Sequence, residues 1–129
     1  MYYQKTILVP ANTTELSPVK VLLPLTRGTI RRFLVSFPPG CHRLTHVQVF
    51  HFGWQLLPWS PGESLAWDNY VFDLTHHYPV EVEPYDLTIR AWNDDDSYDH
   101  TVFVGVLFDE GVFDTITPEL SAILRGISQ

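Results

Sequence analysis

The sequence has few charged residues and only one cysteine, Cys41. Charged residues make up 18% of the 129 residues, below the roughly 25% that is typical of soluble domains. Aromatic residues make up 14%, and a small domain with this balance often covers part of its surface with a partner or with another copy of itself. A single cysteine excludes an internal disulfide and fits folding in a reducing cytoplasm.

Long apolar runs are missing, and so is an excess of positive charge. No run approaches the roughly 20 residues that a membrane-spanning helix needs, and residues 1–5 lack the basic and then apolar pattern of a signal peptide. We therefore expect synthesis in the cytoplasm and no membrane segment. The formal net charge is −7, which argues against nucleic-acid binding because no basic surface is available to neutralise phosphates.

The charge is unevenly distributed along the chain. Six Lys and Arg stand against one Glu in residues 1–60, whereas two Arg stand against fourteen acidic residues in 61–129. Such a split would allow contact between a basic face of one copy and an acidic face of another. The two halves of a β-sandwich interleave, however, so the same charges can also meet within one copy.

Strand-like segments separated by Pro and Gly fill most of the chain. Segments rich in β-branched and aromatic residues alternate with turn residues, and about eight short strands favour an antiparallel β-sandwich of jelly-roll type. We predict a single domain over residues 1–129, in which residues 1–18 form an N-terminal strand and arm. The expected strands are 3–9, 19–25, 29–37, 45–52, 70–74, 80–82, 86–92 and 100–108, with a short one at 55–57.

Alternation within two of these segments, and its absence from a third, predict how their residues face the core. Val47 and Val49 share one face of their strand, with His46, Gln48, Phe50 and Phe52 on the other. Leu87, Ile89 and Ala91 are predicted to point inward, with Trp92 pointing outward. Residues 100–108 are apolar on both faces, which is typical of a central strand or of one covered by a partner.

Residues 109–129 are predicted to form a tail with a short helix. Thr117 can cap the helix, Pro118 suits its first position and Gly126 can end it. One stripe of the helix is apolar, and so short a helix must dock on its own sandwich or on a neighbouring subunit. The stripe consists of Leu120, Ile123, Leu124 and Ile127.

Polar clusters suggest metal sites only weakly. His46 and His51 are five residues apart, so on a strand they point to opposite faces, and His42 with His46 would supply only two ligands. The adjacent pair His76-His77 adds no third. The acidic turn Asp94–Asp99 lacks the Gly and distal Glu of a helix–loop–helix calcium site. We predict no metal and interpret this turn as solvated, with an ion at a subunit junction as the alternative.

Catalytic patterns are equally weak. Cys41 precedes His42, but adjacent residues rarely present a nucleophile to a base. Glu81 and Glu83 would share a strand face at a separation that a glycosidase can use, but no feature marks either as a raised-pKa acid. No nucleophile elbow and no phosphate-binding Gly-rich loop occurs. We therefore predict that the chain is not an enzyme and needs no cofactor.

The most informative feature is an aromatic-rich loop. Trp54, Trp59, Trp67 and Tyr70 fall within twenty residues, together with Phe72. Three interpretations are open. These side chains can stack on sugar rings, anchor a protein interface, or cap the open end of the sandwich as core residues.

Several segments resemble small β-sandwich proteins encoded by tailed bacteriophages and prophages. The resemblance covers most of residues 3–108 and consists of turn and strand signatures rather than catalytic motifs. The segments are FPPGCH at 37–42, HVQV at 46–49 and PYDLTIRAWNDDD at 84–96, together with VPANT at 9–13 and GTI at 28–30.

The resemblance implies a jelly-roll-like structural protein of the virion. The implied role is a capsid decoration or cement protein, which binds the outer capsid surface and clamps neighbouring subunits. Such proteins sit at symmetry axes, often as trimers, so the implied partners are the major capsid protein and copies of the chain itself. The alternative function is a carbohydrate- or receptor-binding module of a tail or fibre. The resemblance assigns no functional residues.

Overall fold

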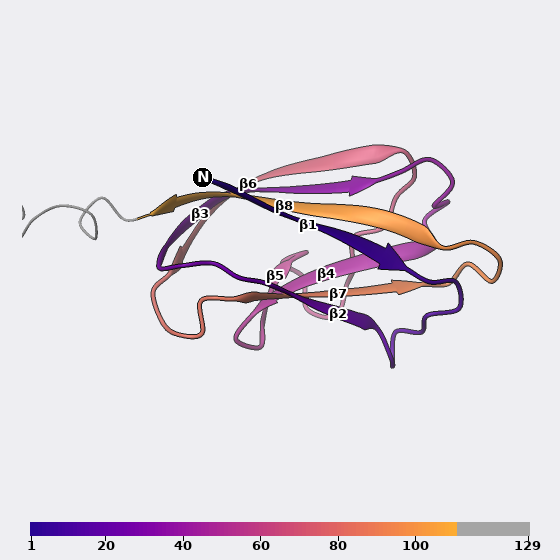
Figure 1. Cartoon of the computed structure of the whole chain (residues 1–129), viewed down its shortest axis with the longest axis horizontal. Helices are drawn as coiled ribbons and strands as arrows, with labels where there is room; N and C mark the ends of the chain where they lie inside the picture. Colours follow the sequence, from indigo (N-terminus) through magenta and orange to yellow (C-terminus); the bar gives the residue numbers. More distant parts are fainter. Residues whose placement is uncertain (111–129) are drawn as a thin grey trace, which may run out of the picture.

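Two four-stranded antiparallel sheets pack face to face in the computed structural model, which describes residues 1–110 (Figure 1). The first sheet has the strand order β1-β8-β3-β6 and the second has the order β2-β7-β4-β5. The prediction of an all-β antiparallel sandwich is confirmed. The strands are β1 (Tyr2–Val9), β2 (Val19–Leu23), β3 (Gly28–Phe37), β4 (Thr45–His51), β5 (Trp54–Leu57), β6 (Tyr70–Val80), β7 (Leu87–Asn93) and β8 (His100–Glu110).

The strands pair in a nested pattern. β4 pairs with β5, β3 with β6, β2 with β7 and β1 with β8, each antiparallel, as in one long hairpin that has been rolled up. Two further pairings, β3 with β8 and β4 with β7, complete the two sheets. Strands that are distant in sequence therefore lie side by side.

The core lies between the sheets, where the alternation predicted it. The inward residues of β4 and β7 are fully buried, as expected for Val47, Val49, Leu87, Ile89 and Ala91. β8 lies between β1 and β3, so its prediction as a central strand is also confirmed. Its inward residues Val102, Val104, Val106 and Phe108 have no exposed surface.

Trp92 shows that an outward position can still be buried. It lies on the face of β7 opposite Ala91, yet it is only 4% exposed. The His46 ring on the neighbouring strand β4 covers it, with ring centroids 5.0 Å apart and planes inclined by 9°. Stacking on this ring buries Trp92 outside the main core.

β6 corrects the sequence prediction in one respect. It is a single strand of 11 residues, not two short strands at 70–74 and 80–82, and Val82 lies beyond its end with 68% exposure. β6 pairs only with β3 and is thus an edge strand. Pro79 is tolerated there because a residue without an N–H group can sit on an edge that has no second partner.

The two ends of the described chain lie in the first sheet. β1 pairs with β8 along its whole length, and residues 10–18 connect it to β2. β8 extends to Glu110, two residues into the predicted tail. The predicted helix, with Leu120, Ile123, Leu124 and Ile127, lies outside the described residues. Residues 1–110 contain no helix, and hence none that could span a membrane.

Two glycines permit close contacts within the first sheet. A Cβ atom on Gly28 would collide with the backbone oxygen of Asp109 and would lie 2.6 Å from Cζ of Phe108. A Cβ atom on Gly105 would instead collide with the hydroxyl group of Tyr2, whose ring lies over this glycine. At Gly28 the added atom would meet backbone that cannot move aside, whereas at Gly105 it would meet one side chain on the edge strand β1.

Candidate functional site

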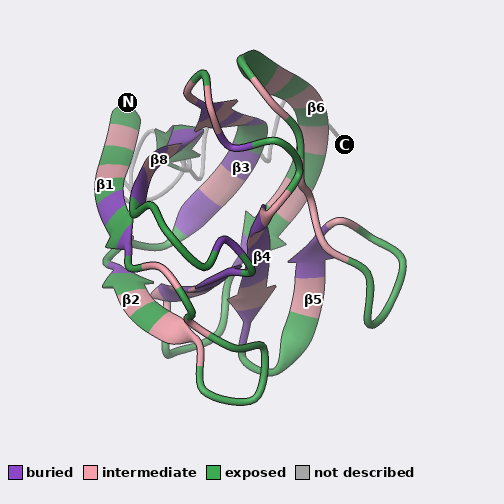
Figure 2. Ribbon diagram, turned by 90° about the vertical axis from the view of Figure 1, so that its right-hand side faces the viewer, coloured by how far each residue is buried: buried purple, intermediate pink, exposed green. Residues whose placement is uncertain are grey.

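Three of the four tryptophans lie on the side of the sandwich formed by the edge strands β5 and β6. β5 ends the second sheet, β6 ends the first, and residues 58–69 connect them along this side, at the right of Figure 2. Trp54, Trp59 and Trp67 are 72%, 66% and 41% exposed. We call this surface the aromatic side. The interpretation of these three residues as core is wrong, which leaves a protein interface or a glycan site.

A groove with a volume of about 640 Å³ opens beside β5, and we call it the Trp54–Trp59 groove. Strands β4, β5 and β6 and the loop after β5 all contribute to its wall. Apolar side chains dominate this wall, so its surface is suited to a hydrophobic ligand group. The lining residues are Phe50, Gly53, Trp54, Gln55, Leu56, Trp59, Pro61 and Tyr78.

The polar side chains of the groove are already engaged within the protein. The Gln55 amide nitrogen donates to three carbonyl oxygens of the following loop at 2.8–3.1 Å, and its oxygen accepts from the backbone N–H of Gly62. The Tyr78 hydroxyl group lies 2.7 Å from Nδ1 of His51. Sugar recognition requires polar groups beside a stacking surface. Among the polar side chains that line this groove, only the two indoles make no hydrogen bond within the protein.

The hairpin between β4 and β5 places Trp54 at the groove. Its two turn residues, Phe52 and Gly53, have φ angles of 53° and 84°, as in tight hairpins with two left-handed residues. A bulky residue rarely adopts this conformation, yet Phe52 does so with 66% of its surface exposed. Trp54 pairs with His51 across the turn. The hairpin thus presents two exposed aromatic side chains together.

A second aromatic cluster lies near the start of β6, and we call it the Trp67 patch. The ring centroids of Trp67 and Tyr70 are 6.4 Å apart, and those of Tyr70 and Phe72 are 5.0 Å apart. The guanidinium carbon of Arg43 lies 4.0 Å from the Trp67 ring centroid, where the negative face of the ring attracts a cation. A hollow of about 490 Å³ lies beside these rings.

Asp68 fixes the loop that carries Arg43. Its Oδ1 atom accepts the backbone N–H groups of His42 at 3.0 Å and of Gly40 at 2.9 Å. These bonds, with the one from His42 contributing most, hold the pKa of the Asp68 carboxyl below its ordinary value. Because Arg43 follows His42, the same bonds fix the backbone from which its side chain reaches the Trp67 ring.

Iodide should quench most of the tryptophan fluorescence of the folded protein, because three of the four indoles are exposed. A variant with phenylalanine at positions 54, 59 and 67 should retain only Trp92, with blue-shifted emission and a several-fold smaller quenching constant. Stern–Volmer titrations of the two proteins measure this difference. Equal quenching constants would contradict the burial of Trp92 and the exposure of the other three.

The histidines do not converge on one site. His46 Nε2 lies 2.9 Å from Oδ2 of Asp94 on the outer face of the second sheet, whereas His51 points inward to Tyr78. The prediction that these two side chains point to opposite faces is confirmed. His42 is exposed in the preceding loop. Within residues 1–110, no three His, Cys, Asp or Glu side chains are grouped so that they could hold a metal ion.

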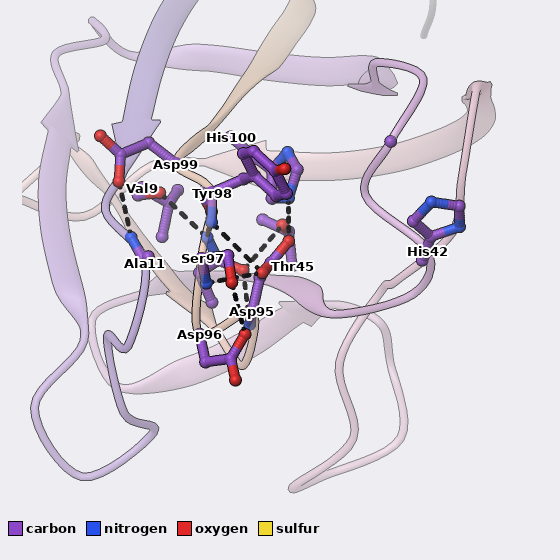
Figure 3. Close-up of polar contacts among 12 residues, drawn as sticks. Val9, Ala11, His42, Thr45, Asp95, Asp96, Ser97, Tyr98, Asp99 and His100 are labelled. Carbon is purple, nitrogen blue, oxygen red and sulfur yellow. Dashed lines mark hydrogen bonds and ion pairs between the residues drawn. The ribbon is translucent and has the colours of Figure 1, made fainter.

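The acidic turn between β7 and β8 is built around a buried carboxylate. Asp95 is 8% exposed, and its Oδ1 atom accepts the backbone N–H groups of Ser97 at 2.9 Å and Tyr98 at 3.2 Å. Its Oδ2 atom lies 2.9 Å from Nε2 of the buried His100 (Figure 3). The interpretation as a solvated turn is therefore wrong for Asp95, although the other acidic residues of 94–99 are exposed.

This network ties together the ends of three strands. The bonds to Asp95, with that from Ser97 contributing most and that from His100 next, hold the pKa of its carboxyl below the ordinary value. Both carboxylate oxygens accept protein donors, which leaves them little capacity for a cation. Asn93 is also fully buried, and its amide nitrogen donates to the carbonyl oxygen of Val9 at 3.2 Å. The ends of β1, β7 and β8 are joined in this way.

The residues considered for catalysis do not form catalytic pairs. Cys41 is fully buried and its burial raises the pKa of the thiol, while its neighbour His42 is exposed. Glu81 and Glu83 both lie beyond the end of β6 and are exposed. They do not share a strand face, contrary to the pattern suggested by the sequence.

The structure brings four of the predicted interface residues to one side of the sandwich, where two further aromatic residues also lie. Trp54, Trp59, Trp67 and Tyr70 all belong to the aromatic side, and Phe52 and Tyr78 join them. Sequence patterns did not indicate the last two. Residues 75–79 resemble a loop in sequence, and phenylalanine is an unusual residue at a tight hairpin turn.

No protein-family model matches the sequence, and no curated protein matches it significantly. Function is therefore inferred from the geometry of the aromatic side and from the arrangement of the strands.

Proposed function

We propose that the chain is a non-enzymatic structural protein of a bacteriophage virion, namely a decoration protein that binds the outer surface of the capsid. The aromatic side carries this proposal, because three tryptophans are exposed along it, two at the Trp54–Trp59 groove and one in the Trp67 patch. Exposed aromatic clusters anchor protein contacts, since they bury much surface at a small cost in entropy. The partners are the major capsid protein and further copies of the chain, and the protein joins the virion after synthesis in the host cytoplasm.

The size of the aromatic side is suited to a stable protein contact. A large aromatic side chain buries roughly 150–250 Å² when it is fully covered. At 72%, 66% and 41% exposure, the three tryptophans together have on the order of 350 Å² left to bury. Each partner of a typical stable complex contributes roughly 800 Å². These side chains are divided between the Trp54–Trp59 groove and the Trp67 patch, so each of the two surfaces supplies part of one partner's share.

The order of the strands supports a jelly roll, which we propose as the finer description of the sandwich. A jelly roll is a double sheet of eight strands built from two Greek keys, and this class includes viral capsid and lectin domains. The nested pairing of β1 with β8, β2 with β7, β3 with β6 and β4 with β5 agrees with a rolled-up hairpin of this kind. Such a fold is compatible with a virion component, although function depends on the site and not on the fold.

Glycan or receptor binding by a tail or fibre module is the alternative function. Trp54 and Trp59 favour it, because exposed indole rings can stack on sugar rings. The engaged side chains of Gln55 and Tyr78 favour the protein partner instead, because they leave few hydrogen-bonding groups in the groove for sugar hydroxyls. Binding of the purified protein to a glycan array, lost in the Trp59→Ala variant, would support the alternative.

The protein should copurify with phage particles at a copy number comparable to that of the major capsid protein. Quantitative mass spectrometry of density-purified particles from the source culture measures this ratio. A few copies per particle would support the tail or fibre alternative. Complete absence of the protein from the particles would refute a role in the virion.

The Trp67→Ala variant should bind to capsids that lack the protein at least about tenfold more weakly, because loss of an interface tryptophan typically costs about 2 kcal/mol. Cosedimentation with capsids over a concentration series measures the affinity. The matched control is Leu22→Ala, which removes a 57% exposed apolar side chain on β2, at the opposite edge of the second sheet from β5. Unchanged binding by Trp67→Ala would exclude the Trp67 patch as a capsid contact.

A further inference from the structure

Leu16 is exposed to an unusual degree. It is 98% exposed, whereas the next most exposed large apolar side chain of residues 1–110, Trp54, is 72% exposed. Leu16 lies in the connection between β1 and β2, at residues 10–18. Single exposed apolar residues are common on protein surfaces. Whether Leu16 has a role therefore depends on how firmly its loop is held and on where the loop lies.

The loop around Leu16 is held in place by hydrogen bonds. The backbone N–H of Asn12 donates to the carbonyl oxygen of Asp95 at 2.8 Å. On the other side, the guanidinium group of Arg90 donates at 3.1 Å to the carbonyl oxygen of Glu15, directly before Leu16. The loop thus presents one apolar side chain from a fixed backbone, which reduces the entropy lost when that side chain binds.

The Trp54–Trp59 groove is the apolar counterpart of this protrusion and lies on the other side of the molecule. β1 and β2 are the edge strands of one side of the sandwich, and β5 and β6 are those of the other (Figure 2). In Figure 1 the β1–β2 connection lies at the right-hand end, and the β4–β5 hairpin lies toward the left. Leu16 therefore cannot reach the groove of its own copy, but it can reach that of another.

We propose that the chain associates with itself head to tail, with Leu16 of one copy seated in the Trp54–Trp59 groove of the next. A contact between two different surfaces of the same protein closes into a ring or continues as an open chain, depending on the rotation between copies. The groove accepts an apolar group because its wall is mostly apolar and its polar residues Gln55 and Tyr78 already bond within the protein. The Trp67 patch stays free for the capsid protein, and self-association does not require the capsid contact.

Sedimentation velocity of the full chain, in the absence of capsids, tests this contact. The wild type should form oligomers as its concentration rises. Leu16→Asp should shift this association to roughly 10- to 100-fold higher concentration, which corresponds to the loss of one buried leucine. Leu16→Met should retain association. Leu8→Asp is the matched control, because Leu8 is 58% exposed on β1 and belongs to neither surface.

A mixture of two variants tests the head-to-tail arrangement directly. Leu16→Asp keeps an intact groove, and the double variant Trp54→Ala, Trp59→Ala keeps an intact Leu16. At concentrations where the wild type associates and Leu16→Asp does not, each variant should be monomeric alone. Their mixture should form one-to-one dimers and nothing larger, because only one intact contact remains per pair. Thermal unfolding confirms that both variants are folded. The proposal is overturned if the wild type is monomeric at every concentration, or if the mixture stays monomeric. If the monomeric wild type still binds capsids, the decoration role remains supported.

Discussion

The Gly28→Ala variant is expected to lose about 10 °C or more in melting temperature, since overpacking of a closed core costs roughly 1–3 kcal/mol or more. The added methyl group meets the backbone oxygen of Asp109 on β8, and it meets the Phe108 ring at 2.6 Å. Phe108 has no exposed surface, so its ring has no free space to move into. Relief would require β3 and β8 to separate at the edge of their pairing. Thermal unfolding followed by circular dichroism measures the change.

Gly105→Ala is the matched control for this prediction. Gly105 is also buried within a strand of the first sheet, but the three atoms nearest to the added methyl group all belong to the side chain of Tyr2. Tyr2 is 49% exposed and lies on an edge strand, so its ring can swing toward solvent. We expect a loss of only a few degrees. Equal losses in the two variants would show that backbone contact is not the cause of the Gly28 effect.

The Asp95→Asn variant should be less stable at neutral pH and should lose the part of the acid sensitivity that this carboxyl group contributes. The native contacts hold the pKa of Asp95 below its ordinary value. A carboxyl group with a depressed native pKa stabilises the fold fully above its unfolded pKa of about 4, and this contribution is lost as the pH falls through the native pKa. The variant lacks the charge that the N–H groups of Ser97 and Tyr98 and the His100 ring stabilise.

Melting temperatures between pH 2 and pH 8 separate this effect from general acid unfolding. At pH 7 the variant should melt roughly 5–10 °C below the wild type, in line with the loss of a buried, charge-assisted network. The two curves should converge at low pH. Asp96→Asn is the control, because Asp96 is exposed and its carboxylate accepts only from the hydroxyl of Ser97. Parallel curves for wild type and Asp95→Asn would contradict the role assigned to the carboxylate.

The sequence predicted the fold well where local patterns and tertiary structure agree. Alternation placed Val47, Val49 and Ile89 in the core, and the Pro38-Pro39 pair correctly marked the end of β3. It failed for β6, where Pro79 and two histidines look like a loop. An edge strand tolerates such residues because one side of its backbone has no partner strand. The sequence does not reveal that β6 is an edge strand, since this depends on the order of all the strands.

The candidate site was predictable in composition but not in geometry. The sequence identified Trp54, Trp59 and Trp67 as notable, yet residue type alone could not show that they are exposed. That depends on their place beside two edge strands. The buried Asp95 was missed because its partner, His100, follows only after an acidic turn that looks solvated. The two residues lie five apart, and this spacing could have indicated the pair.

The nested pairing also determines the order in which the chain can complete its fold. β4 and β5 are separated by two residues, whereas Val9 of β1 must find His100 of β8. Loop-closure entropy grows with separation, so pairing should proceed from the β4–β5 hairpin outward. On the ribosome, β1 emerges first and waits longest for a partner. Until β8 is made, the backbone of β1 is open to strands of other chains. The first of the eight strands to be synthesised is thus the last one protected from aggregation.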